Sequence, residues 1–175
     1  MSTTIDGSAG VTTNSGAVYN GIASGTAVAS TSGTSIDFTG IPSWVKRITV
    51  MFNGVSTNGT SAILAQVGAG SVTTSGYNSG NELANAAGVN LVTSTAGFVA
   101  AQISVNTDSF AGSFTITNIT SNTWVASGVM YRISATGVEM LAGNIALGGT
   151  LDRVRITTVN GTDTFDAGSI NILYE

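Results

Sequence analysis

The feature that most restricts the fold of this chain is an alternation of apolar and polar residues that recurs along it. Residues 47–55 (RITVMFNGV), 112–119 (GSFTITNI), 152–159 (DRVRITTV) and 169–175 (SINILYE) carry apolar side chains at alternate positions. A period of two is typical of a β-strand with one face in a core, because successive side chains point to opposite faces of the sheet. The sequence therefore predicts an all-β protein, an antiparallel, jelly-roll-like β-sandwich.

Short turns separate the alternating segments. The pairs Asn58-Gly59 and Asn160-Gly161 readily adopt the positive φ angles of a tight type I′ hairpin. Because alternating residues flank the second pair on both sides, the last two strands are predicted to pair as an antiparallel hairpin. Residues 166–168 (DAG) are expected to add a bulge or a further turn to the last strand.

One stretch has a composition compatible with a helix. Residues 81–91 (NELANAAGVNL) begin with a potential N-cap, Asn81, and have an acidic residue in the first turn. We expect a short helix there. The main alternative architecture, a β-helix, would require a short fixed repeat, and the sequence contains none.

Composition divides the chain into an arm and a domain. Residues 1–35 are rich in Ser, Thr, Gly and Ala, and their isolated apolar residues follow no sustained period. We expect them to form an extended arm that gains order by packing on its own domain or on a neighbouring subunit. Residues 36–175 are expected to form the sandwich, which is long enough for one hydrophobic core.

Charged residues are scarce. They make up 8% of the 175 residues, and five basic against nine acidic residues give a net charge of −4. Nucleic acid is therefore not an expected partner, because phosphate binding requires a basic surface. Self-association is expected instead, since scattered charges are what keep sheet edges from pairing with neighbours.

The opening segment, MSTTIDGSAGV, has neither the basic region nor the apolar region of a secretory signal. No uninterrupted apolar run approaches the roughly 20 residues that span a bilayer. We expect a soluble protein made in a cytoplasm, with no membrane insertion.

Histidine and cysteine are both absent. This removes the commonest general base, Ser-His-Asp and Cys-His catalysis, disulfides and the usual zinc ligands. A glycoside hydrolase needs only two carboxylates, and Asp163 with Asp166 could contribute to a calcium loop. However, the acidic residues are scattered singly, and Asp152, Asp163 and Asp166 fall near turns, where turn hydrogen bonding is the favoured interpretation. We expect no catalytic residue, metal or cofactor.

Four residues are candidates for contact with a glycan or receptor. Tyr77 and Asn78 lie in a Gly- and Ser-rich segment, and an aromatic face beside an amide suits the apolar patches and hydroxyl groups of a sugar. Arg153 and Arg155 share one face of a strand and could contact an anionic sugar or a neighbouring subunit, although a solvated or cross-strand-paired face is the favoured interpretation. Trp124 lies in a strand pattern and is predicted to be core.

Two blocks resemble segments of bacteriophage tail-fibre and related virion structural proteins. They are residues 35–61 (SIDFTGIPSWVKRITVMFNGVSTNGTS) and 151–175 (LDRVRITTVNGTDTFDAGSINILYE), and the start, MSTTIDGSAGVTT, is similar to the N-terminal part of short members of that group. In such proteins the blocks open and close a β-rich module. The resemblance covers about 50 residues and leaves the middle, roughly residues 62–150, unmatched.

This resemblance implies a non-enzymatic component of a virion that forms a homotrimer. The arm would attach it to other virion proteins, and the domain would contact the host surface, including its glycans. A capsid decoration or head-fibre protein without a receptor role is the alternative within the same class. A polysaccharide depolymerase and a free sugar-binding module are the alternatives from other classes.

Overall fold

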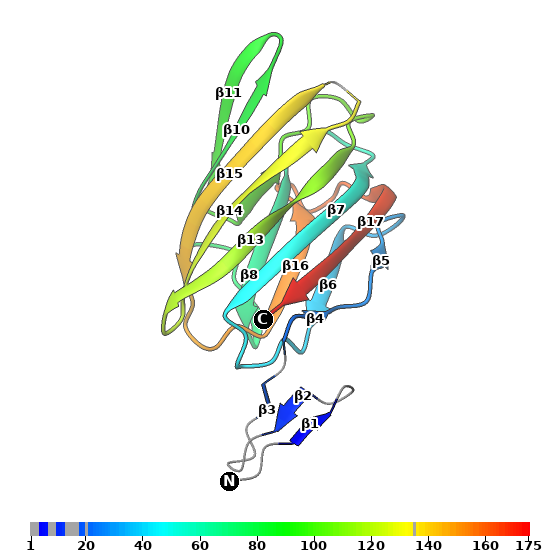
Figure 1. Ribbon diagram of the computed structural model, residues 1–175. Coiled ribbons are helices and arrows are strands. Elements are labelled where there is room, and N and C mark those ends of the chain that lie inside the picture. Colours follow the sequence, from blue (N-terminus) through cyan, green and yellow to red (C-terminus); the bar gives the residue numbers. More distant parts are fainter. Residues whose placement is uncertain (1–3, 7–9, 13–17, 20, 135) are drawn as a thin grey trace.

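The computed structural model describes residues 4–6, 10–12, 18–19, 21–134 and 136–175, and Figure 1 shows its course. These residues form antiparallel strands, and none of the residues described is helical. A nine-stranded sheet packs against a five-stranded sheet. The predicted all-β antiparallel sandwich is therefore confirmed.

Eight strands of the sandwich have the connectivity of a jelly roll. Along the chain they are β5 (Val28–Ala29), β6 (Ser35–Thr39), β7 (Arg47–Thr57), β8 (Ile63–Ala69), β12 (Phe98–Ala101), β13 (Phe110–Thr120), β16 (Arg153–Thr158) and β17 (Phe165–Tyr174). The larger sheet contains the order β5-β17-β7-β13, and the smaller sheet has the order β6-β16-β8-β12. Each sheet thus interleaves early and late strands, as two wrapped Greek keys require.

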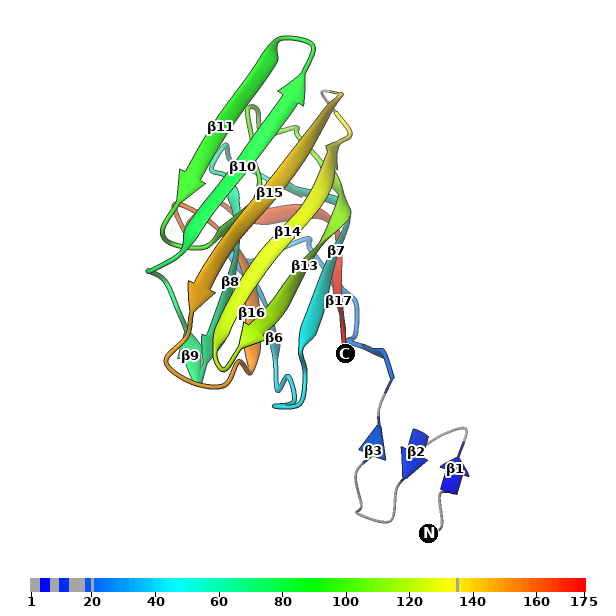
Figure 2. The ribbon, with the colours of Figure 1, turned by 60° about the vertical axis from the view of Figure 1, so that its left-hand side comes forward.

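Two long hairpins widen the larger sheet beyond this jelly roll. One consists of β14 (Thr123–Arg132) and β15 (Gly137–Ala146), and the other of β10 (Asn78–Asn85) and β11 (Gly88–Ser94). From β13 the sheet continues in the order β14, β15, β10, β11, and Figure 2 shows these strands side by side. Short strands β4 (Ala23–Ser24) and β9 (Ser71–Val72) pair with β17 and β8. A separate small sheet contains β1 (Thr4–Asp6), β2 (Gly10–Thr12) and β3 (Val18–Tyr19).

The alternating segments bury their apolar faces between the two sheets. Ile48 and Val50 of β7 are fully buried, and so is Ile116 of β13. The rings of Phe52 and Phe114 meet edge to face with centroids 6.1 Å apart. Each such side chain contributes about 1.5–3 kcal/mol when it is removed from water, so the alternation determines which face of each strand is inside.

The expectation of a helix at residues 81–91 is wrong, because this stretch is the β10–β11 hairpin. Asn85 accepts a hydrogen bond from the N–H of Ala87 at 2.9 Å through its side-chain oxygen. Gly88 then takes a φ of +125°, which other residues rarely adopt. Asn81 is an inward-facing strand residue rather than a helix cap.

The hairpins predicted at the two Asn-Gly pairs are also wrong. Asn160-Gly161 connects β16 of the smaller sheet to β17 of the larger sheet, and Asn58-Gly59 connects β7 to β8, again between sheets. The Asn160 side-chain oxygen accepts hydrogen bonds from the N–H groups of the second and third residues after it, so it shapes a local turn without pairing the flanking strands.

The bulge predicted at residues 166–168 is confirmed. The register of β17 against β7 shifts on both sides of Ala167, and Gly168 has a φ of +91°. Beyond the bulge, β17 is held on its other side by the end of the predicted arm. The N–H of Gly25 donates to the carbonyl of Ile172 at 2.8 Å, and the N–H of Ser30 donates to the carbonyl of Gly168 at 3.0 Å.

Residues 21–34 of the predicted arm therefore pack on the chain's own sandwich. The remainder of the arm prediction falls partly on residues 1–3, 7–9, 13–17 and 20, which lie outside the described residues.

Candidate functional site

Tyr77 does not present its ring to solvent. Its side chain is 1% exposed, and the ring lies edge to face against Phe98 with centroids 5.0 Å apart. The hydroxyl donates to the carbonyl of Thr73 at 3.0 Å and accepts from the N–H of Val67 at 2.8 Å. Burial raises the pKa of this hydroxyl to about 12. The prediction that Tyr77 offers an aromatic face to a sugar is therefore wrong.

Asn78, in contrast, is exposed at the rim of a shallow polar hollow. Its side-chain N–H donates to the amide oxygen of Asn144 at 3.3 Å. The hollow has a volume of about 430 Å³ and is lined by Tyr77, Asn78, Ser79, Thr93, Ser94 and Thr95. Each of these residues carries a hydroxyl or amide group, so the hollow can exchange hydrogen bonds with a neutral polyhydroxylic ligand. We call it the hydroxylic hollow.

Arg153 and Arg155 are each bound to a carboxylate of the same chain. Arg155 forms a bidentate pair with Asp37, its cross-strand neighbour, at 2.7 and 3.0 Å. Arg153 binds Asp152 at 2.7 and 3.1 Å, and this hydrogen bonding lowers the pKa of Asp152. The structure thus gives both arginines a carboxylate partner within the chain, and the partner of Arg155 lies on the neighbouring strand whereas that of Arg153 precedes it in the sequence.

The other two acidic residues near the last turn also have hydrogen-bond partners, Asp163 in the loops and Asp166 on the neighbouring strand β7. Asp163 accepts from the N–H of Ser61 at 3.0 Å and from the amide of Asn160 at 2.6 Å. Asp166 accepts from the hydroxyl of Ser56. Within the described part of the chain, no three acidic residues gather as a metal site would require.

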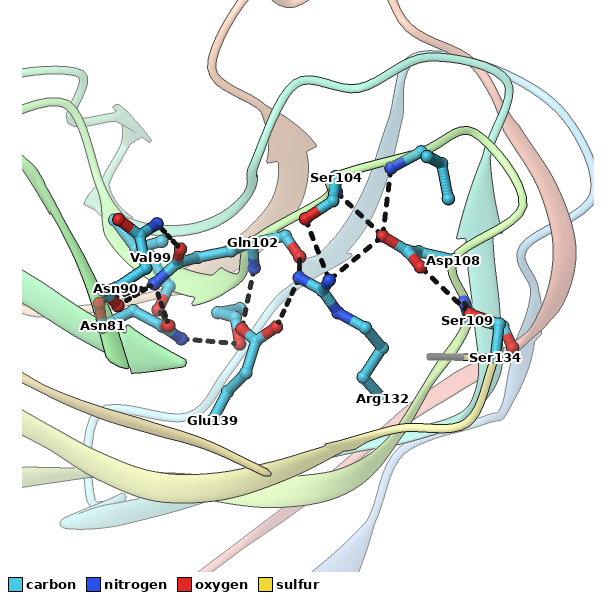
Figure 3. A network of polar contacts seen from close by, with 12 residues as sticks. Asn81, Asn90, Val99, Gln102, Ser104, Asp108, Ser109, Arg132, Ser134 and Glu139 are labelled. Carbon is cyan, nitrogen blue, oxygen red and sulfur yellow. Dashed lines mark hydrogen bonds and ion pairs between the residues drawn. The ribbon is translucent and has the colours of Figure 1, made fainter. Parts of the chain in front are cut away.

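The sequence did not reveal a network of polar residues buried between the sheets, which Figure 3 shows. Its centre is Arg132 of β14, whose guanidinium lies 3.4 Å from Asp108 and 3.2 Å from Glu139. All three side chains are buried. The guanidinium also donates to the carbonyl of Gln102 and to the hydroxyl of Ser104.

Glu139 links this ion cluster to a row of amides. It accepts from the backbone N–H of Gln102 at 2.7 Å, and the Gln102 side chain donates to the Asn81 side-chain oxygen at 2.9 Å. Asn90 donates to Gln102 at 2.7 Å. Burial raises the pKa of Glu139, while Gln102 and Arg132 oppose this rise by stabilising the ionised form. The network ties β10, β11 and the segment after β12 to the hairpin of β14 and β15.

This network is built to hold strands together rather than to act on a substrate. The carboxylates of Asp108 and Glu139 face one shared cation, and neither is exposed. The sequence did carry a signal for it. Arg132 is in phase with the buried Met130, and Glu139 is in phase with the buried Leu141, so charged residues occupy inward positions of two alternating strands.

The outward side of the same hairpins carries large exposed apolar residues. They lie on three strands of the larger sheet, β14, β15 and β11, with β10 between the last two, and we call them the outer apolar face: Val89, Leu91, Val129, Tyr131, Val138 and Met140. Each keeps between 42% and 68% of its surface exposed. Single exposed apolar residues are ordinary, whereas a contiguous group is typical of an interaction surface.

Comparison of the chain with models of protein families, with curated proteins and with solved structures found no match. Among the described residues, no helix is long and apolar enough to cross a membrane.

Proposed function

We propose that this protein is a non-catalytic structural component of a bacteriophage virion, similar to a tail-fibre module, that assembles as a homotrimer and contacts the host surface. The observation that carries the proposal is the outer apolar face, because an exposed group of this kind suits a subunit of an assembly. The resemblance of residues 35–61 and 151–175 to virion proteins supports it. The jelly roll is also an architecture of viral capsid and lectin domains. The fold is therefore consistent with a virion role, but other functions use the same fold.

The use of the acidic residues supports a non-catalytic role. Seven of them form ion pairs or hydrogen bonds within the chain: Asp37, Asp108, Glu139, Asp152, Asp163, Asp166 and Glu175. A glycoside hydrolase needs one protonated and one ionised carboxylate facing the same sugar. Asp152, Asp163 and Asp166, which were the sequence candidates, already have partners within the chain.

Contact with the host is assigned to the hydroxylic hollow around Asn78. A shallow site of this kind binds a neutral glycan weakly, since it offers hydrogen bonds but buries little apolar surface. Three copies on one trimer and several trimers on one particle would convert weak contacts into firm attachment through their effective concentration. The arm, residues 1–35, is proposed to connect the domain to other virion proteins.

Immunogold labelling of phage particles tests the proposal. Antibodies against the purified protein should label particles of the phage that encodes it, and labelled tails would distinguish a fibre from a capsid decoration protein. Unlabelled particles would overturn the proposal.

A second assay addresses the enzymatic alternative. The purified protein should release no reducing ends from host polysaccharide, and the triple variant Asp152→Asn, Asp163→Asn, Asp166→Asn should behave as the unmodified protein does. Turnover that disappears in the triple variant would instead establish a depolymerase.

A further inference from the structure

The outer apolar face is continuous because the strand register aligns its residues in two rows. In one row, Val129 of β14 pairs with Met140 of β15, Met140 pairs with Glu82 of β10, and Glu82 pairs with Leu91 of β11. Cross-strand partners lie about 5 Å apart on the same face of a sheet. Apolar side chains therefore flank Glu82 on both sides.

The second row runs parallel to the first, two residues further along each strand. Tyr131 pairs with Val138, Val138 with Ala84, and Ala84 with Val89. The two rows together span β14, β15, β10 and β11, which Figure 2 shows as one side of the sandwich. No charged residue interrupts the second row.

The size of this face fits one side of a subunit interface. Six half-exposed large apolar side chains amount to a patch on the order of 500 Å², close to the largest patches that monomeric proteins carry. A standard interface buries about 800 Å² per partner, and about 65% of that area is apolar in homodimers. The outer apolar face supplies this apolar share without any rearrangement of the chain.

Glu82 is the charged residue in the rows of this face. It lines a hollow of about 400 Å³ with Gly80, Leu91 and Met140, and it forms no ion pair or hydrogen bond with any residue that the structure describes. If two copies met about a two-fold axis through this hollow, two carboxylates would approach each other where water is expelled, which is unfavourable. A head-to-tail contact avoids this repulsion, and such contacts form a ring when the rotation from one copy to the next closes, as a three-fold rotation does.

The chain also carries a basic residue that can complement Glu82 in such a contact. All four arginines form ion pairs within the chain. The ammonium group of Lys46 instead lies 3.5 Å from the amide oxygen of Asn118, and it pairs with no carboxylate of the described residues. Lys46 is exposed at the entry to β7.

We infer that a second copy of this chain covers the outer apolar face in a head-to-tail contact, in which Glu82 of one copy pairs with Lys46 of the next. The inference rests on the proposed homotrimer and names the surface through which its subunits meet. Leu91 and Met140 supply apolar walls for the aliphatic stem of the lysine, and the carboxylate of Glu82 receives its ammonium group.

Light scattering behind a sizing column, over a range of concentrations of the full chain, tests this inference with a matched pair of variants. Val129 and Val159 are 52% and 54% exposed, but Val159 lies outside the outer apolar face. Val129→Asp should raise the concentration at which the oligomer half-dissociates at least tenfold, and Val159→Asp should leave it unchanged. Thermal unfolding of both variants verifies that they fold.

A charge exchange tests the pairing of Glu82 with Lys46. It does not depend on the loss of β-propensity that Val129→Asp also causes. Glu82→Lys and Lys46→Glu should each weaken the oligomer, and the double variant should restore it. If the double variant dissociates as readily as the single variants, the pairing is overturned. If the Val129→Asp variant keeps the oligomer mass and dissociation concentration of the unmodified protein, the interface is overturned.

A monomer at every concentration would overturn this inference, whereas particle labelling would still support the virion role. A monomer whose incorporation into particles is lost in Val129→Asp would assign the face to a different virion protein and would also overturn the inference.

Discussion

The hydroxyl group of Tyr77 accepts a hydrogen bond from the backbone N–H of Val67 at 2.8 Å, inside the sandwich. Val67 lies between the two partners of one edge of β8, since pairing with β12 extends to Ala65 and pairing with β9 begins at Gly68. The carbonyl of Val67 accepts from the N–H of Thr73, the residue after β9. The tyrosine therefore provides a partner for a strand group that would otherwise be buried without one. An aromatic residue in a Gly- and Ser-rich segment here serves the fold.

Tyr77→Phe should lower the free energy of unfolding by about 1–3 kcal/mol at neutral pH, because the N–H of Val67 loses its partner in a buried site. Tyr174→Phe is the control, since the Tyr174 ring keeps its contact with Trp44 and its hydroxyl forms no hydrogen bond with any described residue, so the substitution should change stability by less than about 0.5 kcal/mol. Urea denaturation measures both variants, and equal stabilities would contradict the structural role of the Tyr77 hydroxyl.

The alkaline stability of the protein should depend on the same hydroxyl. Because burial raises the pKa of Tyr77 from 10.0 to about 12, the fold favours the neutral phenol. Its contribution to stability is complete below pH 10 and is lost as pH rises toward 12, by about 3 kcal/mol in total. This decline should be absent in Tyr77→Phe. Denaturation midpoints between pH 9 and 12 that fall equally in both proteins would refute the assignment.

Arg132→Met should be among the most destabilising substitutions in the chain. It leaves the carboxylates of Asp108 and Glu139 buried without their cation, which costs about 3–5 kcal/mol. Arg155→Met removes an ion pair at the surface and should cost less than about 1 kcal/mol. The free energies of unfolding of the two variants are compared. Similar losses would show that the buried ion cluster contributes no more to stability than the surface ion pair does.

Glu139→Gln should alter the pH dependence of stability. The folded protein favours the protonated form of Glu139, because burial raises its pKa above the ordinary value of 4.5. The unmodified protein should therefore lose stability from this group as pH rises from about 4.5 toward neutral. The glutamine variant lacks this component. Its free energy of unfolding should therefore rise relative to that of the unmodified protein as the pH increases. A constant difference would exclude titration of Glu139 in this range.

Gly168→Ala should disrupt the bulge in β17. The position has a φ of +91°, and an added Cβ would overlap the backbone of Gly54, so we expect a loss of about 3 kcal/mol. Gly161→Ala isolates the conformational part of this effect, since Gly161 has a φ of +66° but open space around it, and it should cost about 1 kcal/mol. Equal losses of unfolding free energy in the two variants would mean that the contact between the added Cβ and Gly54 adds no destabilisation of its own.

Strand positions and inward faces could be predicted from the sequence, but pairing could not. Alternation in a single strand determines which side chains enter the core, and Ile48 and Ile116 are buried as expected. The partner of a strand depends on contacts with distant residues. Asn160-Gly161 illustrates this limit, because a local turn can lead the chain into the same sheet or across to the other one, and the flanking residues alternate in both cases.

The candidate site was harder to predict because its members come from separate strands. The Asn81 segment suggested a helix through its composition and its potential N-cap, and the β10–β11 hairpin hides its strand pattern because apolar residues occur on both of its faces. Leu83 points into the sandwich while Leu91 lies on the outer apolar face, so no clean alternation remains. The outer apolar face itself follows from the register, which no single segment reveals.

The position of β17 between β7 and the β4–β5 segment has a consequence for biosynthesis. Ser56 of β7 and Asp166 of β17, which share a hydrogen bond, are 110 residues apart. At ordinary rates of translation the ribosome needs roughly 5–20 s to add that many residues. During this interval β7 has one edge without its final partner, and such edges are aggregation-prone. A host chaperone that shields nascent β7 should therefore raise the soluble yield of the protein.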